Sequence, residues 1–120
     1  MTKLLIIDDE IKLRQTISEL FSLSGYEVIE AQDGLEGLKK IKQMPVDLII
    51  CDVMMPKLDG YAFIEQLKKT IYANIPVLFL SAKTELSDKQ TAMNLGAKAY
   101  ITKPFAFNEL KSIVEAYTLK

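Results

Sequence analysis

The residues of this chain that could do chemistry are carboxylates, hydroxyls and lysines, since the 120-residue sequence has no histidine and a single cysteine, Cys51. The missing histidine excludes the usual zinc sites and the Ser-His and Cys-His catalytic pairs. A lone cysteine cannot form an internal disulfide. Residues of the remaining reactive types end or follow apolar runs at four places, which are Asp8-Asp9, Asp52, Ser81 and Lys103.

Three carboxylates in one place repel one another and raise each other's pKa unless a cation neutralises them. A Mg²⁺-like ion suits Asp8, Asp9 and Asp52, because Mg²⁺ prefers oxygen ligands and keeps several waters. A hydroxyl and a fixed ammonium, as in Ser81 and Lys103, are suitable partners for an anion that bridges to such an ion. The pattern predicts phosphoryl transfer with Asp52 as the nucleophile.

Five short apolar runs predict the strands that position these residues. Several of them are apolar on both faces, which is typical of parallel strands covered by helices on each side. The predicted strands span residues 3–8, 26–31, 46–52, 76–81 and 98–102.

The segments between these runs have apolar residues at helical spacing and recognisable end signals. Asp33 and Asp59 are predicted N-caps of the second and third helices. The fourth helix is predicted at residues 87–95, and Gly96 can take the left-handed conformation that ends it. Its partly buried positions are predicted to be Ala92, Met93 and Leu95.

The fifth helix is predicted to follow Asn108 as its N-cap. Its residues repeat at the i, i+3, i+4, i+7 spacing that indicates one buried helix face. The apolar stripe consists of Leu110, Ile113, Val114 and Tyr117.

Five strands that alternate with five helices predict a doubly wound α/β domain with a parallel sheet. The carboxyl ends of the strands then share one edge, where such folds bind their ligands. The reactive residues named above are therefore expected to gather there. Residues 1–120 are predicted to form one domain, because the length suits one core and no linker or repeat interrupts it.

Charge and hydropathy exclude several classes of partner. Fifteen basic and sixteen acidic residues give a net charge of −1, and the lysines are dispersed, so direct nucleic-acid binding is not expected. No apolar stretch approaches the ~20 residues that cross a bilayer, so no membrane association is expected. No signal-peptide pattern follows Met1, and the expected location is the cytoplasm.

Five motifs stand in a fixed order along nearly the whole chain. They are Ile6-Ile7-Asp8-Asp9-Glu10, Asp52 followed by Met55-Pro56, Asp59-Gly60, Ser81-Ala82 and Lys103-Pro104-Phe105. In this combination the chain resembles the receiver (CheY-like) domain of bacterial two-component response regulators. The resemblance implies a flavodoxin-like (βα)5 three-layer sandwich with a parallel five-stranded sheet in the order 2-1-3-4-5.

The resemblance also implies a phosphoacceptor switch rather than an enzyme. A histidine kinase or histidine phosphotransfer protein would donate its phosphoryl group to Asp52 in a Mg²⁺-dependent reaction, with Mn²⁺ as an expected substitute. By the same analogy Asp9 and Asp52 hold the metal directly and Asp8 acts largely through water. The backbone carbonyl of Met54 completes the protein ligands.

Further roles follow from the same resemblance. Ser81 and Lys103 would contact the phosphoryl oxygens, and the Lys-Pro peptide is typically cis in the family. Tyr100 matches the aromatic that turns inward when the hydroxyl residue moves toward the phosphoryl group. Met54 and Lys83 occupy the positions that tune phosphoryl lifetime. Neither suits hydrolysis, so slow self-dephosphorylation is predicted.

The output surface implied by the resemblance is the fourth helix, fifth strand and fifth helix, where Lys98, Tyr100, Phe105 and Phe107 could contribute to partner binding. The target is a downstream protein or a fused effector domain beyond the chain. A phosphorylation-dependent homodimer stays open. The dimer of the winged-helix transcription-factor subgroup is not favoured, because Ala97-Lys98-Ala99 stands where that subgroup usually has acidic residues.

The same residues allow other interpretations. A haloacid-dehalogenase phosphohydrolase needs Asp-x-Asp after the first strand and a substrate cap, which this sequence lacks. A flavodoxin-like FMN protein needs a phosphate loop where Asp8-Asp9-Glu10 would repel the phosphate. A phosphorylation-independent interaction module stays open as the alternative function. Taken singly, Asp8 or Asp9 could cap the first helix, and Tyr100 could be a packed strand aromatic.

Overall fold

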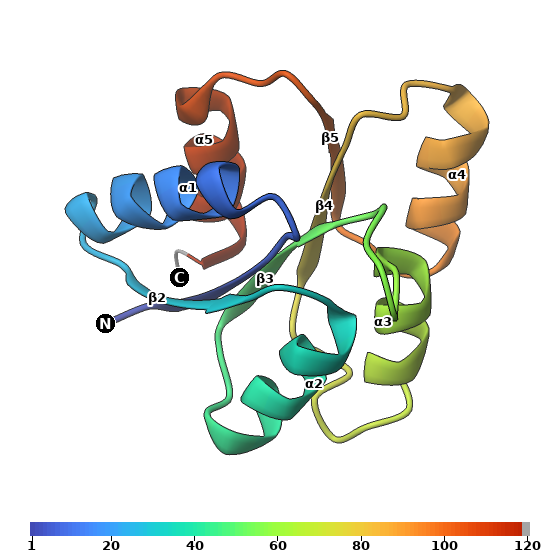
Figure 1. Cartoon of the computed structure of the whole chain (residues 1–120), viewed down its shortest axis with the longest axis horizontal. Coiled ribbons are helices and arrows are strands. Elements are labelled where there is room, and N and C mark those ends of the chain that lie inside the picture. Colours follow the sequence, from blue (N-terminus) through green and yellow to red (C-terminus); the bar gives the residue numbers. More distant parts are fainter. Residues whose placement is uncertain (119–120) are drawn as a thin grey trace.

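The computed structural model describes residues 1–118 and contains one parallel sheet with helices on both faces (Figure 1). The strands are β1 (Lys3–Ile7), β2 (Glu27–Ala31), β3 (Leu48–Asp52), β4 (Val77–Ser81) and β5 (Ala99–Thr102). The helices are α1 (Ile11–Leu23), α2 (Gly34–Gln43), α3 (Gly60–Leu67), α4 (Leu86–Asn94) and α5 (Phe107–Thr118). The strand order within these residues is β2-β1-β3-β4-β5, so the predicted fold is confirmed.

The two faces of the sheet have separate apolar cores, because neighbouring residues of a strand point to opposite faces. Leu4 and Ile6 pack with Phe21 of α1 and Val114 of α5. The residues between and after them, such as Ile7, pack on the other face, where the buried side chains of the remaining helices lie. Those side chains are Ile41 of α2, Phe63 of α3 and Ala92 of α4. Figure 1 shows α1 and α5 on one side of the sheet and α2, α3 and α4 on the other.

Two predicted helix caps and one predicted stop are confirmed. The Asp33 side chain accepts a hydrogen bond from the backbone N–H of Glu36, and Asp59 accepts one from Ala62. Gly96 follows α4 with φ of 104°, in the left-handed region that glycine adopts without steric cost.

Three details of the predicted helices are wrong. Asn108 lies inside α5 and does not cap it, since the helix begins at Phe107 and the Ala106 carbonyl accepts the N–H bonds of its first turn. Met93 was predicted to be partly buried and Tyr117 to lie in the apolar stripe, but both are exposed, at 42% and 43%. Spacing along a helix does not say how far its buried stripe extends, which depends on how the helix lies on the sheet.

Strand β1 begins at Lys3 as predicted, whereas the other four strands begin one or two residues later than predicted. Residue 46 was expected to open the third strand, but β3 begins at Leu48. Asp47 there accepts a hydrogen bond from the backbone N–H of Lys3 through its side chain and donates its own N–H to the Lys3 carbonyl. No helix among residues 1–118 combines the length and apolar character that crossing a membrane requires.

Candidate functional site

The sheet brings the reactive residues to its carboxyl edge. Asp8 follows β1 directly, Asp52 is the last residue of β3 and Ser81 is the last residue of β4. Lys103 follows β5 in the same way. The strand register sets this arrangement, since Ile7 pairs with Cys51, and Ser81 pairs with Thr102.

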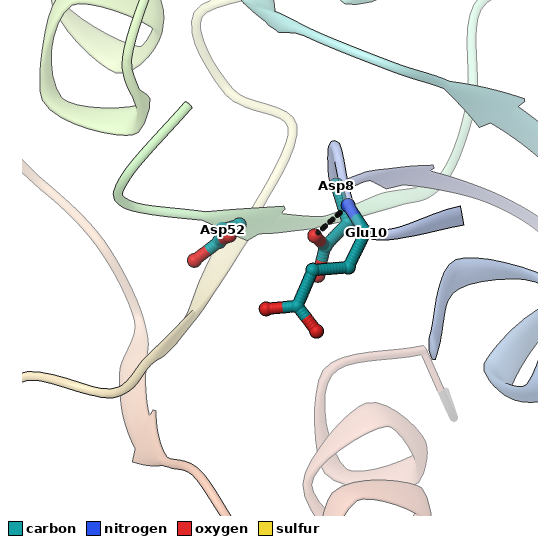
Figure 2. A group of neighbouring side chains, drawn as sticks. All are labelled: Asp8, Glu10 and Asp52. Atoms are coloured by element: carbon teal, nitrogen blue, oxygen red, sulfur yellow. Dashed lines mark hydrogen bonds between the residues drawn. The ribbon is translucent and has the colours of Figure 1, made fainter. Parts of the chain in front are cut away.

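Three carboxylates meet at this edge, as Figure 2 shows. One carboxylate oxygen from each of Asp8, Glu10 and Asp52 lies within 4.8 Å of the others. Asp8 and Asp52 are buried, whereas the Glu10 side chain is mostly exposed and reaches over them. The backbone N–H of Glu10 donates to Asp8 Oδ1 at 2.9 Å, which fixes the turn between β1 and α1 (Figure 2).

Lys103 supplies a positive charge to this cluster. Its Nζ atom lies 3.3 Å from Asp8 Oδ2, 3.5 Å from Asp52 Oδ2 and 3.6 Å from Glu10 Oε1. The ammonium group is largely buried, and the peptide bond to Pro104 is cis, as predicted. One ammonium facing three carboxylates leaves the cluster negatively charged, which favours a further cation.

The electrostatic balance raises the pKa of Asp52 from the ordinary 3.8 to about 6. Burial is the main cause, the charges of Asp8 and Asp9 add to it, and Lys103 opposes it. Burial lowers the pKa of Lys103, but the neighbouring carboxylates outweigh this effect and its pKa is raised. Lys103 is therefore a permanent cation beside a carboxyl whose ionisation is costly.

Comparison with known proteins identifies the family and agrees with the fold. The family model for the response regulator receiver domain matches residues 4–115. The chain belongs to this family. It is a receiver domain of a two-component signalling system, as the sequence motifs predicted.

Relatives and solved structures agree with this membership. The alkaline phosphatase synthesis transcriptional regulatory protein PhoP of Bacillus subtilis is 43% identical over 114 residues, which are 95% of this chain and 47% of PhoP. A protein named probable transcriptional regulator ycf27 in Porphyridium aerugineum is 40% identical with the same coverage. The receiver domain thus spans about half the length of these curated relatives.

Two solved structures show how closely the backbone matches. The receiver domain of Francisella response regulator 1452 superposes with a TM-score of 0.92 and 36% identity, covering 98% of this chain and 96% of that one. The chemotaxis protein CheY4 of Vibrio cholerae has a TM-score of 0.91 and 35% identity, covering 98% of both chains.

Asp9 and Glu10 lie differently from the expectation that Asp8, Asp9 and Asp52 form one cluster. Within the described residues Asp9 is not part of the close carboxylate group, and its exposed side chain instead lines a neighbouring cavity of about 370 Å³. Met54 and Lys83 line the same cavity. Glu10 belongs to the group, although no role was predicted for it. Its position two residues after Asp8, on the last turn before α1, is the signal that could have found it.

The hydroxyl side of the site is preformed. Ser81 is fully buried, and its Oγ accepts a hydrogen bond from the backbone N–H of Lys83 at 3.0 Å. Tyr100 is half-buried against the core, and its hydroxyl donates to the carbonyl of Lys83 at 3.0 Å. Both side chains therefore hold the segment between β4 and α4.

The residues expected on the output surface divide into two groups. Lys98 is exposed beside β5, whereas Phe105 and Phe107 are half-buried. Phe107 packs edge-on against Phe21, with ring centroids 4.9 Å apart. Both phenylalanines pack against the apolar cluster that contains Phe21. They also line a groove of about 530 Å³ beside α1.

Proposed function

We propose that this receiver domain takes a phosphoryl group onto Asp52 from a histidine kinase or a histidine phosphotransfer protein. The observation that carries the proposal is the position of Asp52, buried at the sheet edge with the Lys103 ammonium 3.5 Å away. The donor histidine must come from the partner, because this chain has none.

The transfer needs an ionised Asp52. A carboxylate oxygen attacks phosphorus, a new P–O bond gives the acyl phosphate, and the P–N bond breaks with its electron pair left on the imidazole nitrogen. With a pKa of about 6, Asp52 is mainly ionised at neutral pH and above. Burial keeps water from competing for its oxygens.

The donor set fits a Mg²⁺ ion. Hard oxygen ligands gather here, and the single ammonium group of Lys103 does not neutralise the carboxylates around it. Asp8 and Asp52 of this group would hold Mg²⁺ or Mn²⁺ together with Asp9 and the backbone carbonyl of Met54, two residues that line the neighbouring cavity. When bound, the ion neutralises charge on the phosphoryl oxygens.

Ser81 and Lys103 are proposed to hold the phosphoryl group. Lys103 is already anchored beside Asp52, and its raised pKa keeps it charged. The Ser81 hydroxyl accepts its bond from Lys83, which leaves its own proton to donate to a phosphoryl oxygen.

The output is proposed to pass through α4, β5 and α5 to a downstream protein or a fused effector domain. Tyr100 links β5 to the segment before α4, so movement of Ser81 toward a phosphoryl group would change the position of residues on this face. The regulators PhoP and ycf27 are about twice as long as the region they share with this chain, which supports the fused arrangement, with residues 1–120 as its receiver part. A stand-alone receiver is the other arrangement, and this domain itself is not expected to bind DNA.

The phosphoryl group is proposed to be lost slowly. Met54 is 59% exposed and lines the cavity beside Asp9 and Lys83, where it offers no good hydrogen bond to an attacking water. Met54→Asn supplies an amide at that place. The phosphoryl group of this variant should therefore have a half-life at least about threefold shorter than that of wild type, measured in a dephosphorylation time course. A wild-type half-life of seconds would contradict the proposal.

The test of the function is phosphoryl uptake from acetyl phosphate, read by intact mass with Mg²⁺ or with EDTA. Wild type should gain one phosphoryl mass, ~80 Da, only with Mg²⁺, and Asp52→Asn should gain none. Asp47→Asn is the matched control, because Asp47 lies before β3 at the opposite end of the strand, and it should behave as wild type. No gain by folded wild type would favour a phosphorylation-independent interaction module.

A further inference from the structure

Helix α4 is held weakly by apolar packing. Of its nine residues, all within the described chain, Ala92 is the buried one. Glu85 stands at the N-cap without a side-chain hydrogen bond to the described residues. Leu86 and Met93 are 70% and 42% exposed. Other interactions must therefore set the position of this helix.

Tyrosine hydroxyl groups supply such interactions around α4. Among residues 1–118, the hydroxyl of Tyr61 donates to the carbonyl of Asp88, in the first turn of α4, at 3.2 Å. Tyr100 donates to Lys83 ahead of the helix at 3.0 Å. Tyr117 donates to Lys98, just beyond the helix, at 3.2 Å. Three separate elements thus each hold one part of the α4 region.

Tyr61 is rigidly joined to the phosphoacceptor strand. The preceding residue, Gly60, donates its N–H to the Val53 carbonyl, and a Cβ at Gly60 would lie 2.5 Å from the Asp52 carbonyl oxygen. The Tyr61 ring packs edge-on against the fully buried Phe79 of β4, with centroids 5.6 Å apart. The ring therefore has a fixed place relative to Asp52.

The Tyr61 hydroxyl keeps its proton at physiological pH. Partial burial, followed by the proximity of Tyr100 and Asp88, raises its pKa to about 12. It can therefore donate to the Asp88 carbonyl throughout the range in which the domain works.

The segment between the two tyrosine anchors carries groups of the proposed site. Residues 82–85 connect Ser81 to α4, and Lys83 lines the cavity that Asp9 and Tyr61 also line. Tyr100 fixes the start of this segment, and Tyr61 fixes the helix turn at its end. A segment held at both ends loses less conformational freedom when a ligand binds beside it.

We infer that Tyr61 is a positioning residue for phosphoryl binding. Its hydroxyl links the first turn of α4 to α3, whose start lies against the Asp52 backbone, and so preorganises Ser81 and Lys83. This inference rests on the proposed function. It concerns a residue of α3 that does not touch the phosphoryl group and acts through the segment at residues 82–85.

The test compares Tyr61→Phe with Tyr117→Phe by isothermal titration with beryllofluoride, a phosphoryl mimic, in Mg²⁺ buffer. Each variant removes one tyrosine hydroxyl that donates to a carbonyl at 3.2 Å. The Kd of Tyr61→Phe should rise about 3- to 10-fold, the usual effect of one hydrogen bond. Tyr117→Phe should stay within about twofold of wild type, because its bond is to Lys98, beyond the C-terminal end of α4.

Hydrogen exchange on the unliganded proteins gives a second readout. Amides of residues 83–88 should exchange faster in Tyr61→Phe than in wild type, and should be unchanged in Tyr117→Phe. Equal Kd values for the two variants, or unchanged exchange in Tyr61→Phe, would overturn the inference while wild type still bound beryllofluoride. A wild type that binds none would overturn the proposed function and, with it, the role of Tyr61.

Discussion

Helices α3 and α4 both follow a strand that ends in a proposed site residue, yet they are held in different ways. Four residues of α3 are buried, including Phe63 and Leu67, and the Asp59 side chain caps its first turn. Of the described residues of α4, Ala92 is the buried one, and Glu85 offers no such cap. The two helices are nearly equal in length, so burial and capping, not size, separate them.

The difference assigns the two helices different parts in a switch. The start of α3 lies against the Asp52 backbone so closely that there is no room for a side chain at position 60. The proposed phosphoacceptor therefore has a rigid support. Elements that move in signalling come from the less stable parts of a fold. Helix α4, which hydrogen bonds position more than apolar burial does, is suited to change place when Ser81 or Tyr100 moves.

The largest effect should come from removing the apolar anchor of α3. Phe63 is fully buried, so Phe63→Ala should lower the free energy of unfolding by ~3–5 kcal/mol, measured by urea denaturation. Met93→Ala on α4 should change it by less than about 0.5 kcal/mol, because Met93 is 42% exposed. A comparable loss for the two variants would contradict the contrast between the helices.

The next largest effect should come from the free energy that ionising Asp52 costs the folded state. Because the pKa of Asp52 is raised to about 6, protonation favours the folded state, and this stabilisation disappears as pH rises from 3.8 through about 6. In EDTA at pH 7.5, Asp52→Asn should therefore be more stable than wild type by roughly 1–3 kcal/mol, with the difference fading below pH 4. Urea denaturation across pH 3–8 measures this dependence.

The matched change on α4 should have the opposite sign. Asp88 is partly buried in the first turn of α4, where a negative charge suits the helix dipole, so Asp88→Asn should lose ~0.3–1 kcal/mol. Adding Mg²⁺ should stabilise wild type more than Asp52→Asn, because the ion would bind the folded carboxylate cluster. If Asp52→Asn were less stable than wild type in EDTA, ionisation of Asp52 would not destabilise the folded state.

The strands, the edge that their ends share and two of the helix caps could be predicted from local sequence. The continuous apolar runs before Asp8, Asp52 and Ser81 predict buried parallel strands whose ends share an edge, and the structure confirms that edge. The caps at Asp33 and Asp59 were also predictable, because a capping side chain bonds a backbone N–H only two or three residues away.

Features that depend on tertiary placement could not be obtained in this way. Asp8, Asp9 and Glu10 are consecutive acids, and which of them faces Lys103 depends on the turn between β1 and α1. The exposure of Met93 depends on how α4 lies against the sheet, which spacing alone does not reveal. The Tyr61 bond to the Asp88 carbonyl joins residues 27 apart, beyond the reach of any local pattern.

The helix starts give a smaller effect than the loss of the Phe63 side chain or of the Asp52 charge. Asp59→Ala removes the side-chain oxygen that accepts the Ala62 N–H, so it should cost ~1 kcal/mol in urea denaturation. Glu85→Ala at the corresponding position of α4 removes no such bond among the described residues, and should stay within about 0.5 kcal/mol of wild type.

Asp59→Asn separates the cap from the charge. The amide oxygen of asparagine caps a helix as well as a carboxylate does, so most of the stability should be retained while the charge is lost. If Asp59→Asn were as destabilising as Asp59→Ala, the negative charge of Asp59 would matter more than its hydrogen bond. The start of α3 would then owe its stability to long-range electrostatics, and the contrast with α4 would rest on the burial of residues such as Phe63 alone.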